Sequence, residues 1–344
     1  MLSSVYTSKS EINTTKFAQN MVKSMNFKGV VCLYGEIGAG KTVFAKGCAE
    51  ALGVHKSKIK SPTFSFIREY KEKNVEMYHC DFYRINNDDE VLHHTLNEIM
   101  KKKNALVIIE WAQNLSQVLP KNRIDIFFEY KAKNSRKLTI KFPQNTDWIS
   151  DLYKKYFTPA HVIKHMKTVA DFALKMGEKF IKKGTYVDLK RIEEIALLHD
   201  LLKPISFFNW GGSQFGQKMA PSKNAIKLWT KLQKKYGFGN DVQATMDVLK
   251  NLDRKNQDMA SLAGSVLTQQ FDAIISQKYP LKTLEETLVY YADKRVKHTK
   301  VVTLKERFED GRKRYFQNRK IPKYTSVIER KIYKLEKSLL HNLT

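Results

Sequence analysis

The segment Gly35-Glu36-Ile37-Gly38-Ala39-Gly40-Lys41-Thr42 decides the fold of the first half of the chain. It matches the phosphate-binding loop pattern G-x-x-x-x-G-K-[ST]. The apolar run 30–34 before it predicts a buried strand, and residues 43–49 after it predict a helix. Because the pattern requires this strand–loop–helix context, the alternative of a chance glycine-rich turn is the weaker interpretation.

The residue types in this loop suit the phosphate chain of a nucleotide. Glycines allow backbone N–H groups to converge on phosphate oxygens, and the dipole of the helix that follows favours anions. Lys41 is expected to reach the terminal phosphates, and the hydroxyl of Thr42 is expected to bind Mg²⁺. The sequence therefore predicts a site for ATP or ADP with Mg²⁺.

Length and composition set the class of protein. The 344 residues suggest two domains, and the 42% hydrophobic content is enough for packed cores. No apolar run reaches the length of about 18 residues that a membrane span needs, and no secretory signal is evident. The cysteines Cys32, Cys48 and Cys80 match no zinc spacing, so we expect buried free thiols in the cytoplasm.

The chain is strongly basic, with a formal net charge of +26. Residues 1–150 carry 23 Lys and Arg against 15 Asp and Glu, a net +8, and the remainder carries 38 against 20, a net +18. A field of this sign attracts polyanions such as tRNA. A Lys-rich surface that only keeps the protein in solution is the alternative, since no nucleic-acid-binding motif is evident.

The first half is expected to be an α/β domain with a mainly parallel sheet. Amphipathic spacing predicts a helix over residues 12–25, capped by Thr14 or Thr15. Apolar runs and alternating patterns predict the strands. Besides the strand before the loop, these are expected at residues 61–70, 75–83, 105–111, 124–130 and 137–142, with a further helix at 88–100.

Two acidic residues follow apolar strands in this half. Glu110 ends the run 105–110, and Asp81 ends another strand. A carboxylate at such a position binds Mg²⁺ or orients water in phosphate-loop enzymes. Either residue alone is more often an ordinary strand-end carboxylate. Together with Lys41 and Thr42, however, they favour metal–nucleotide chemistry.

Residues 1 to about 145 resemble the TsaE family of ATPases, which take part in tRNA threonylcarbamoyladenosine biosynthesis. Four segments occur in the family's order and spacing. These are the phosphate loop, Ser61-Pro62-Thr63-Phe64, His79-Cys80-Asp81-Phe82-Tyr83-Arg84 and Ile109-Glu110-Trp111.

The resemblance implies roles for these residues. Lys41 would contact the phosphates, and Thr42, Asp81 and Glu110 would hold Mg²⁺, with Glu110 also directing the attacking water. Thr63 would lie near the γ-phosphate, and Trp111 would belong to the nucleotide site. The family's activity implies that ATP hydrolysis resets a TsaB–TsaD-type complex between turnovers. Lys41, Asp81 and Glu110 would then be the catalytic residues.

The second half is expected to be all-helical. We expect the ATPase domain to span residues 1–147 and a linker to span 148–157, followed by a helical domain at 158–303 and a basic helical extension at 304–344. Helical spacing supports this division. The helices are predicted at residues 162–181, 192–202, 224–235, 242–252, 262–275, 284–296 and 304–340.

Four residues in this half have the chemistry of a metal site. His199 and Asp200 follow the apolar turn 195–198, where an unpaired Asp almost never occurs. His165 and Asp293 are supplied by other helices, and the four together can surround one divalent cation. A partly buried core histidine is the alternative for His165 taken alone.

The order His, His-Asp, Asp over roughly residues 157–300 resembles the HD family of metal-dependent phosphohydrolases. The resemblance implies that His165, His199, Asp200 and Asp293 bind Mn, Fe, Co, Ni or Zn, and that Asp200 is catalytic. Two departures weaken this. No histidine lies between His199 and His298, which favours a mononuclear site, and no acid follows Asp200 directly.

The leading hypothesis is a TsaE-like ATPase fused to an HD phosphohydrolase acting on a nucleotide or phosphoester. In the alternative, the HD part is an inactive scaffold that binds tRNA or a nucleotide. A small-molecule kinase would also use a phosphate loop, but the first half shows no arginine-rich lid segment.

Overall fold

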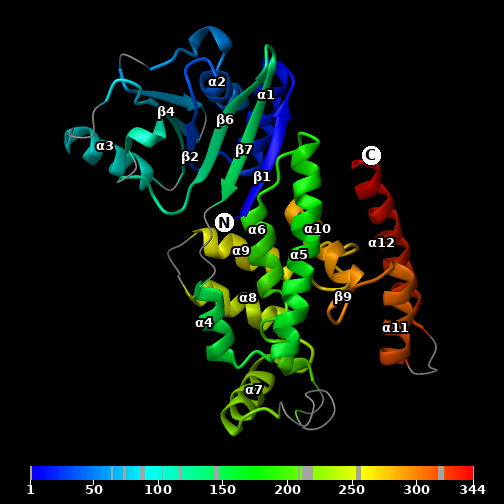
Figure 1. Cartoon of the computed structure of the whole chain (residues 1–344). Helices are drawn as coiled ribbons and strands as arrows, with labels where there is room; N and C mark the ends of the chain where they lie inside the picture. The colour runs from blue at the N-terminus through cyan, green and yellow to red at the C-terminus, as the bar shows by residue number, and fades with distance from the viewer. Residues whose placement is uncertain are drawn as a thin grey trace. The chain divides into compact units, whose positions relative to one another are not determined.

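The computed structural model divides the chain into two compact units, each of which is described by itself (Figure 1). Unit 1 consists of residues 1–144 and 178–190, and unit 2 of residues 145–177 and 191–344. The structure describes residues 2–62, 65–72, 75–85, 90–102, 104–115, 118–142, 147–207, 210, 220–252, 257–316 and 321–343.

A seven-stranded mixed sheet forms the centre of unit 1, with the order β1-β7-β6-β2-β5-β4-β3. The central strands β6, β2, β5 and β4 are parallel, whereas β1, β7 and β3 pair antiparallel at the two sides. The predicted α/β class is therefore confirmed for this unit. The strands are β1 Leu2–Ser8, β2 Gly29–Tyr34, β3 Ile67–Glu72, β4 Val75–Asp81, β5 Ala105–Glu110, β6 Ile124–Ala132 and β7 Ser135–Phe142.

Three helices accompany this sheet: α1 Glu11–Ser24, α2 Lys41–Ala51 and α3 Glu90–Met100. Strand β5 is buried along its whole length, as expected for a strand covered on both faces. Helix α3 packs with its buried residues on one face of the sheet. This core includes Cys32, Cys80, Leu92, Leu96, Ile99, Val107 and Ile109.

Helices α1 and α2 pack closely, and Gly47 of α2 is the reason that they can. A Cβ at this position would lie 2.9 Å from the carbonyl oxygen of Thr15 and 3.1 Å from the Cβ of Ala18. Such a distance forces one helix to shift, which costs about 1–3 kcal/mol. The small side chain therefore fixes the approach of the two helices.

We expect Gly47→Ala to lower the melting temperature of the full chain by several degrees, although alanine is the better helix former by about 1 kcal/mol. Gly264→Ala in helix α9 (Gln257–Leu267) is the control, because a Cβ there meets nothing within 4 Å. That change should leave stability unaltered or raise it. Calorimetry of both variants makes the comparison, and equal effects would contradict the packing argument.

Several sequence predictions in unit 1 are corrected. The first helix is capped by Ser10, whose Oγ accepts from the N–H of Asn13 at 3.2 Å, and not by Thr14 or Thr15. The first strand of the hairpin begins at Ile67 rather than residue 61, because Phe66 adopts a φ of 59° that interrupts extended backbone. Strand β1 was not predicted.

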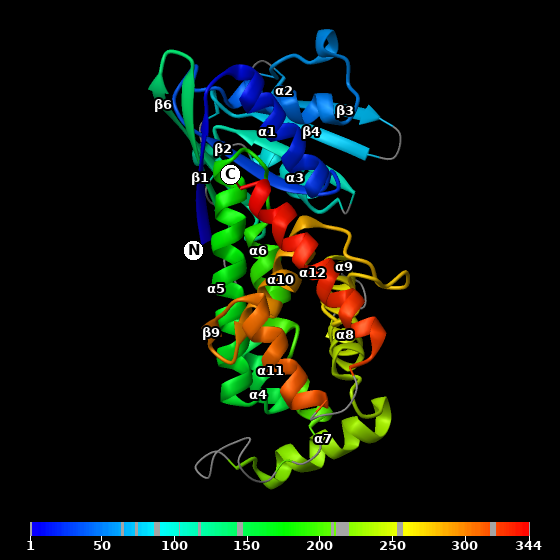
Figure 2. The same cartoon turned by 90° about the vertical axis from the view of Figure 1, so that its right-hand side faces the viewer.

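The described residues of unit 2 form helices and one short antiparallel ribbon, β8 (Val296–Lys297) with β9 (Lys300–Val301) (Figure 2). An all-helical class is thus largely right for this part of the chain. The main helices that lie wholly or mostly in this unit are α4 Asp147–Tyr156, α5 Ala160–Lys182, α6 Leu189–Leu198, α7 Lys223–Tyr236, α8 Asp241–Leu252, α9, α10 Leu284–Arg295, α11 Leu304–Phe316 and α12 Lys323–His341; residues 178–182 of α5 and 189–190 of α6 belong to unit 1.

The expected linker and tail both differ from prediction. Residues 148–156 of the expected linker lie in helix α4, because Ile149, Leu152 and Tyr153 recur at helical spacing and are buried. The predicted single helix 304–340 is two helices, and α12 begins after Pro322, which cannot continue a helix. Within unit 2, helix α12 contacts α10, and Glu336 of α12 pairs with Arg295 of α10 at 2.9 Å.

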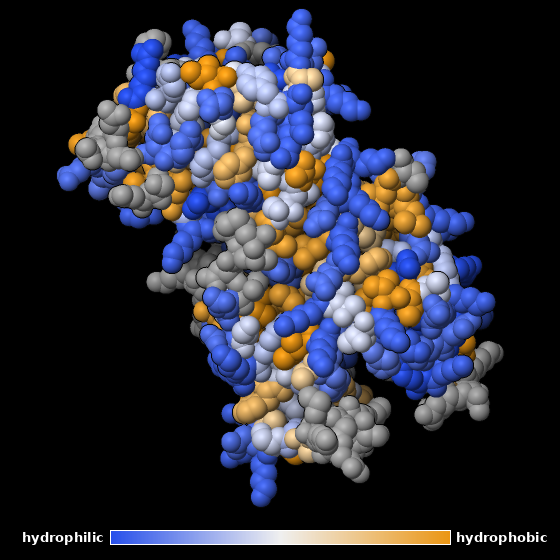
Figure 3. Space-filling model, in the orientation of Figure 1, coloured by the Kyte–Doolittle hydropathy of each residue, from blue (hydrophilic) through white to orange (hydrophobic). Residues whose placement is uncertain are grey.

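Hydrophilic residues cover most of the visible surface, and hydrophobic residues form separate patches (Figure 3). Among the described residues, no helix combines the length and apolar character needed to cross a bilayer. All three cysteines are buried free thiols, as predicted, and burial raises the pKa of Cys32 to about 12.

Candidate functional site

The glycines of the phosphate loop adopt backbone angles that other residues rarely tolerate. Gly35 has a φ of 136°, and a Cβ there would lie 2.5 Å from the carbonyl oxygen of Phe128 on β6. Gly40 has a φ of 107° and begins helix α2, whose first N–H groups have no partner within the helix. The loop can therefore turn tightly and present amide groups to an anion.

Lys41 lies folded over this loop. Its Nζ donates to the carbonyl oxygens of Gly35 at 2.7 Å and Glu36 at 2.9 Å, and it lies 4.0 Å from the ring centre of Trp111. The residue is buried, and burial lowers the pKa of Lys41 although nearby carboxylates act in the opposite direction. The ammonium group thus occupies the hollow of the loop.

Two side chains contact the carboxylate of Glu110, which ends β5 and is 2% exposed. The Thr42 hydroxyl donates to its Oε2 at 2.8 Å, and the Nε2 of His79 lies 2.8 Å from its Oε1. Asp81 is the register partner of Glu110 on β4, and its Oδ2 accepts from the hydroxyl of Ser61 at 3.1 Å. The parallel strands therefore bring both predicted acids to the edge that carries the loop. Oxygen donors of this kind suit Mg²⁺.

Two aromatic residues that follow strands lie together beside the site: Tyr83 after β4 and Trp111 after β5. Trp111 has a φ of 59°, which ends β5 at Glu110, and its ring lies 4.8 Å from that of Tyr83. The tryptophan ring therefore lies against the ammonium group of Lys41 at the loop. Thr63, predicted near the γ-phosphate, lies outside the described residues.

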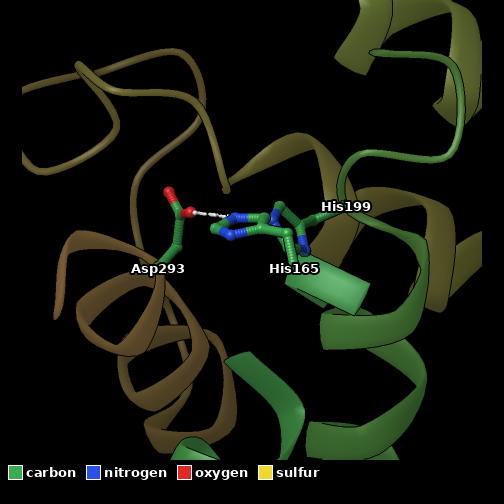
Figure 4. A group of neighbouring side chains, drawn as sticks. All are labelled: His165, His199 and Asp293. Carbon is green, nitrogen blue, oxygen red and sulfur yellow. Dashed lines mark hydrogen bonds and ion pairs between the residues drawn. The ribbon is translucent and has the colours of Figure 1, made fainter. Parts of the chain in front are cut away.

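A second cluster lies in unit 2, where the side chains of His165, His199 and Asp293 point toward one another (Figure 4). They come from α5, from the residue after α6 and from α10. Within the described part of the chain, one ligand atom from each lies within 4.8 Å of the others. The structure thus joins three of the four predicted ligands in one group.

Backbone carbonyls fix which nitrogen of each histidine faces the cluster. The Nδ1 of His165 lies 2.9 Å from the carbonyl oxygen of His298, and the Nδ1 of His199 lies 2.8 Å from that of Ala196. A carbonyl only accepts, so both Nδ1 atoms carry the proton, and in the neutral rings both Nε2 atoms offer a lone pair. These Nε2 atoms lie 3.1 and 3.7 Å from Oδ1 of Asp293. The Nε2 of His199 is buried and makes no hydrogen bond within the described chain. A divalent transition metal fits this donor set.

Two lysines pair with the acid of this cluster, Asp293, and with the neighbouring Asp200. Lys294, which is buried, donates to Oδ2 of Asp293 at 2.6 Å, and Lys203 lies 3.3 Å from Oδ1 of Asp200. Asp200 is not in the group of three, although its Oδ2 is 3.7 Å from Nε2 of His199. Burial would raise the pKa of Asp293, but Lys294 and the two histidines hold it well below its ordinary value.

Comparisons with known proteins concern the first unit. The profile of the family described as threonylcarbamoyl adenosine biosynthesis protein TsaE matches residues 8–138. The tRNA threonylcarbamoyladenosine biosynthesis protein TsaE of Bacillus subtilis is 36% identical over 110 residues, which are 32% of this chain and 67% of the relative. Its counterpart from Rickettsia bellii is 31% identical over 126 residues, which are 37% of this chain and 86% of the relative.

The chain belongs to the TsaE family. The crystal structure of YdiB from Bacillus subtilis is also similar, at 24% identity and a TM-score of 0.35, and the match covers 46% of this chain and 97% of that one. The TsaE match ends at residue 138, so the cluster of unit 2 lies outside it.

Sequence reasoning missed side chains that hold the loop of the TsaE part. The hydroxyl of Tyr130 donates to the carbonyl oxygen of Ile37 at 3.2 Å, and Nε of Arg136 donates to that of Ala39 at 3.1 Å. Both belong to the β6–β7 hairpin, which is about 90 residues from the loop in sequence. No local pattern joins the two segments, so only the fold reveals the contact.

Proposed function

We propose that the TsaE part binds ATP with Mg²⁺ and hydrolyses it in support of tRNA N6-threonylcarbamoyladenosine biosynthesis. The observation that carries this proposal is the convergence of Lys41, Thr42, Asp81 and Glu110 at one end of the parallel strands. Membership of a family named for this pathway gives the reaction its context.

Each residue has a role that follows from its position. The loop amides and Lys41 hold the phosphate chain, and Lys41 would leave the carbonyls of Gly35 and Glu36 to do so. The oxygens of Thr42, Asp81 and Glu110 would hold Mg²⁺, which neutralises charge on the phosphates. The carboxylate of Glu110 would also orient the attacking water. Trp111 and residues 35–40 complete the nucleotide site, and Thr63 is proposed to lie beside the γ-phosphate.

Hydrolysis would reset a TsaB–TsaD-type complex in the cytoplasm between rounds of tRNA modification. The test is production of the full chain in a bacterial strain that lacks its own TsaE. We expect the modified adenosine to reappear in tRNA hydrolysates analysed by mass spectrometry. In vitro, the Mg²⁺-dependent release of phosphate should increase when the TsaB–TsaD pair is added. Absence of both effects would reject this function.

For unit 2, the favoured candidate is a mononuclear metal site of the HD phosphohydrolase type, acting on a nucleotide or phosphoester. The three-residue cluster and the buried Nε2 of His199 favour it. The metal would be Mn, Fe, Co, Ni or Zn, with His165, His199 and Asp293 as ligands. Asp200 would be the fourth ligand and a catalytic residue if it turned from Lys203.

An inactive scaffold that binds tRNA or a nucleotide is the second candidate for this unit. It is favoured by the pairing of Lys203 with Asp200 and Lys294 with Asp293, which leaves little negative charge for a cation. Phosphate release from a panel of nucleotides, measured on metal-loaded full chain, separates the two. Turnover supports the enzyme, and tRNA affinity that falls with salt, without turnover, supports the scaffold.

A further inference from the structure

His79 lies directly beneath the acidic edge of the phosphate site. It is on β4, two residues before Asp81, so both side chains point to the same face of the sheet. Asp81 is the register partner of Glu110 on β5, and His79 is the partner of Ile108. His79 is therefore a diagonal neighbour of Glu110, a spacing that long side chains can bridge.

In the hydrogen bond between His79 and Glu110, the donor can be assigned to one ring nitrogen of the histidine. His79 is 0% exposed, and its Nε2 lies 2.8 Å from Oε1 of Glu110. Its Nδ1 is buried and has no hydrogen-bond partner in the described chain. Because the carboxylate needs a proton donor and an Nδ1–H would be left without an acceptor, the proton belongs on Nε2. The ring then donates a single hydrogen bond, to Glu110.

Burying the imidazole ring of His79 costs free energy of desolvation, and the hydrogen bond to Glu110 offsets that cost. A buried strand position is usually filled by an apolar side chain, and a polar group there loses its hydration. The second oxygen of Glu110, Oε2, accepts from Thr42. With one donor on each oxygen, from β4 and from α2, the carboxylate plane cannot rotate, and the remaining lone pairs keep a fixed direction.

We propose that His79 is a positioning residue for ATP hydrolysis, which holds Glu110 in the orientation that acts on the attacking water and itself touches neither nucleotide nor metal. This inference rests on the proposed ATPase function. It predicts that loss of the hydrogen bond slows the chemical step and leaves nucleotide binding intact.

The test compares three variants of the full chain. His79→Leu fills the space without a donor, His79→Gln carries an amide N–H at about the distance of Nε2, and His79→Asn carries one only at the distance of Nδ1. We expect kcat to fall about 10- to 100-fold in the Leu and Asn variants, the range found for groups that orient an acting side chain. The Gln variant should recover to within about threefold of wild type.

Two further readouts separate positioning from a structural role. The KM for ATP and the Kd for ADP should stay within about twofold of wild type in all variants, and the melting temperatures of the Gln and Asn variants should agree. Imidazole ¹⁵N spectra should show the Nε2–H form of His79 in the nucleotide-free wild type, with that resonance shifted in Glu110→Ala.

The outcomes distinguish the positioning role of His79 from the proposed ATPase function on which it rests. A wild-type chain that never hydrolyses ATP rejects both. A hydrolysing wild type with an equally fast His79→Leu variant rejects the positioning role alone, as does an unrecovered Gln variant or a parallel loss of ADP affinity. If the Leu variant does not fold, the comparison of Gln with Asn still decides the question.

Discussion

Lys41→Ala is expected to reduce Mg²⁺-dependent ATP hydrolysis by about 100-fold or more, the scale of removing one preorganised donor from a charged transition state. In the wild-type chain the ammonium group of Lys41 lies inside the loop, where it donates hydrogen bonds to the carbonyl oxygens of Gly35 and Glu36. In a phosphate loop this group moves to the terminal phosphates, where negative charge develops. ATP affinity should fall as well, because the same charge holds the ground state.

The matched control is Lys46→Ala, which removes the same charge from an exposed position on the same helix. It should leave kcat and KM within about twofold of wild type. Phosphate release and equilibrium binding of ADP measure both variants, and melting curves show whether Lys41→Ala remains folded. Hydrolysis that is equal in the two variants would contradict the assignment of the site.

The arrangement of the candidate nucleotide site could be predicted from sequence because its parts are local or follow a rule of the fold. The loop is eight consecutive residues, and the strand and helix that frame it adjoin it in sequence. Asp81 and Glu110 each end a strand, and parallel neighbours end at the same edge of a sheet. The residues that support the site were not predicted. His79 belongs to a segment that the resemblance marked, but its contact with Glu110 was not expected, and Tyr130 and Arg136 reach the loop from a hairpin with no sequence signal of this role.

Strand β1 was not predicted from the sequence for a different reason. Its inward face carries Leu2, Ser4, Tyr6 and Ser8, of which the two serines are buried, while the outward Val5 is half-buried. Polar and apolar side chains therefore occur on both faces of the strand, and hydrophobic patterning does not detect it. Ser8 is accommodated by hydrogen bonds, one of them to Thr14 at 2.7 Å. The strand exists because β7 offers it a complete antiparallel partner.

In unit 2 the sequence predicted the ligand types but not their relative directions. Helix α6 ends at Leu198, and the side chains of the next two residues, His199 and Asp200, remain 3.7 Å apart. His199 turns inward to Asp293, whereas Asp200 faces Lys203. The adjacent letters of the motif do not show that the second carboxylate pairs with a lysine three residues further along the chain.

Asp293→Asn is expected to weaken transition-metal binding by more than about 100-fold. Mutation of residues that only hydrogen-bond to a metal ligand already lowers metal affinity by about 10- to 100-fold, and loss of a ligand should cost more. The Oδ1 of Asp293 faces the Nε2 atoms of both His165 and His199, and an amide is a much poorer ligand than a carboxylate. Asp272→Asn is the control, because it removes the same charge from an exposed position in the same unit. Metal content after dialysis against Mn²⁺ or Zn²⁺, by mass spectrometry, gives the comparison.

The same change tests the electrostatic role of Lys294. In the metal-free chain, Asp293→Asn leaves this buried ammonium without its carboxylate, so the variant should also melt at lower temperature. Burial acts to lower the pKa of His199, but the charges of Asp200 and Asp293 outweigh it and raise the value. Metal must displace the proton from Nε2, so wild-type affinity should fall as pH drops through this raised pKa. Metal retention that is equal in the two Asp variants, or unchanged on acidification, would show that these side chains form an ion-pair network rather than a metal site.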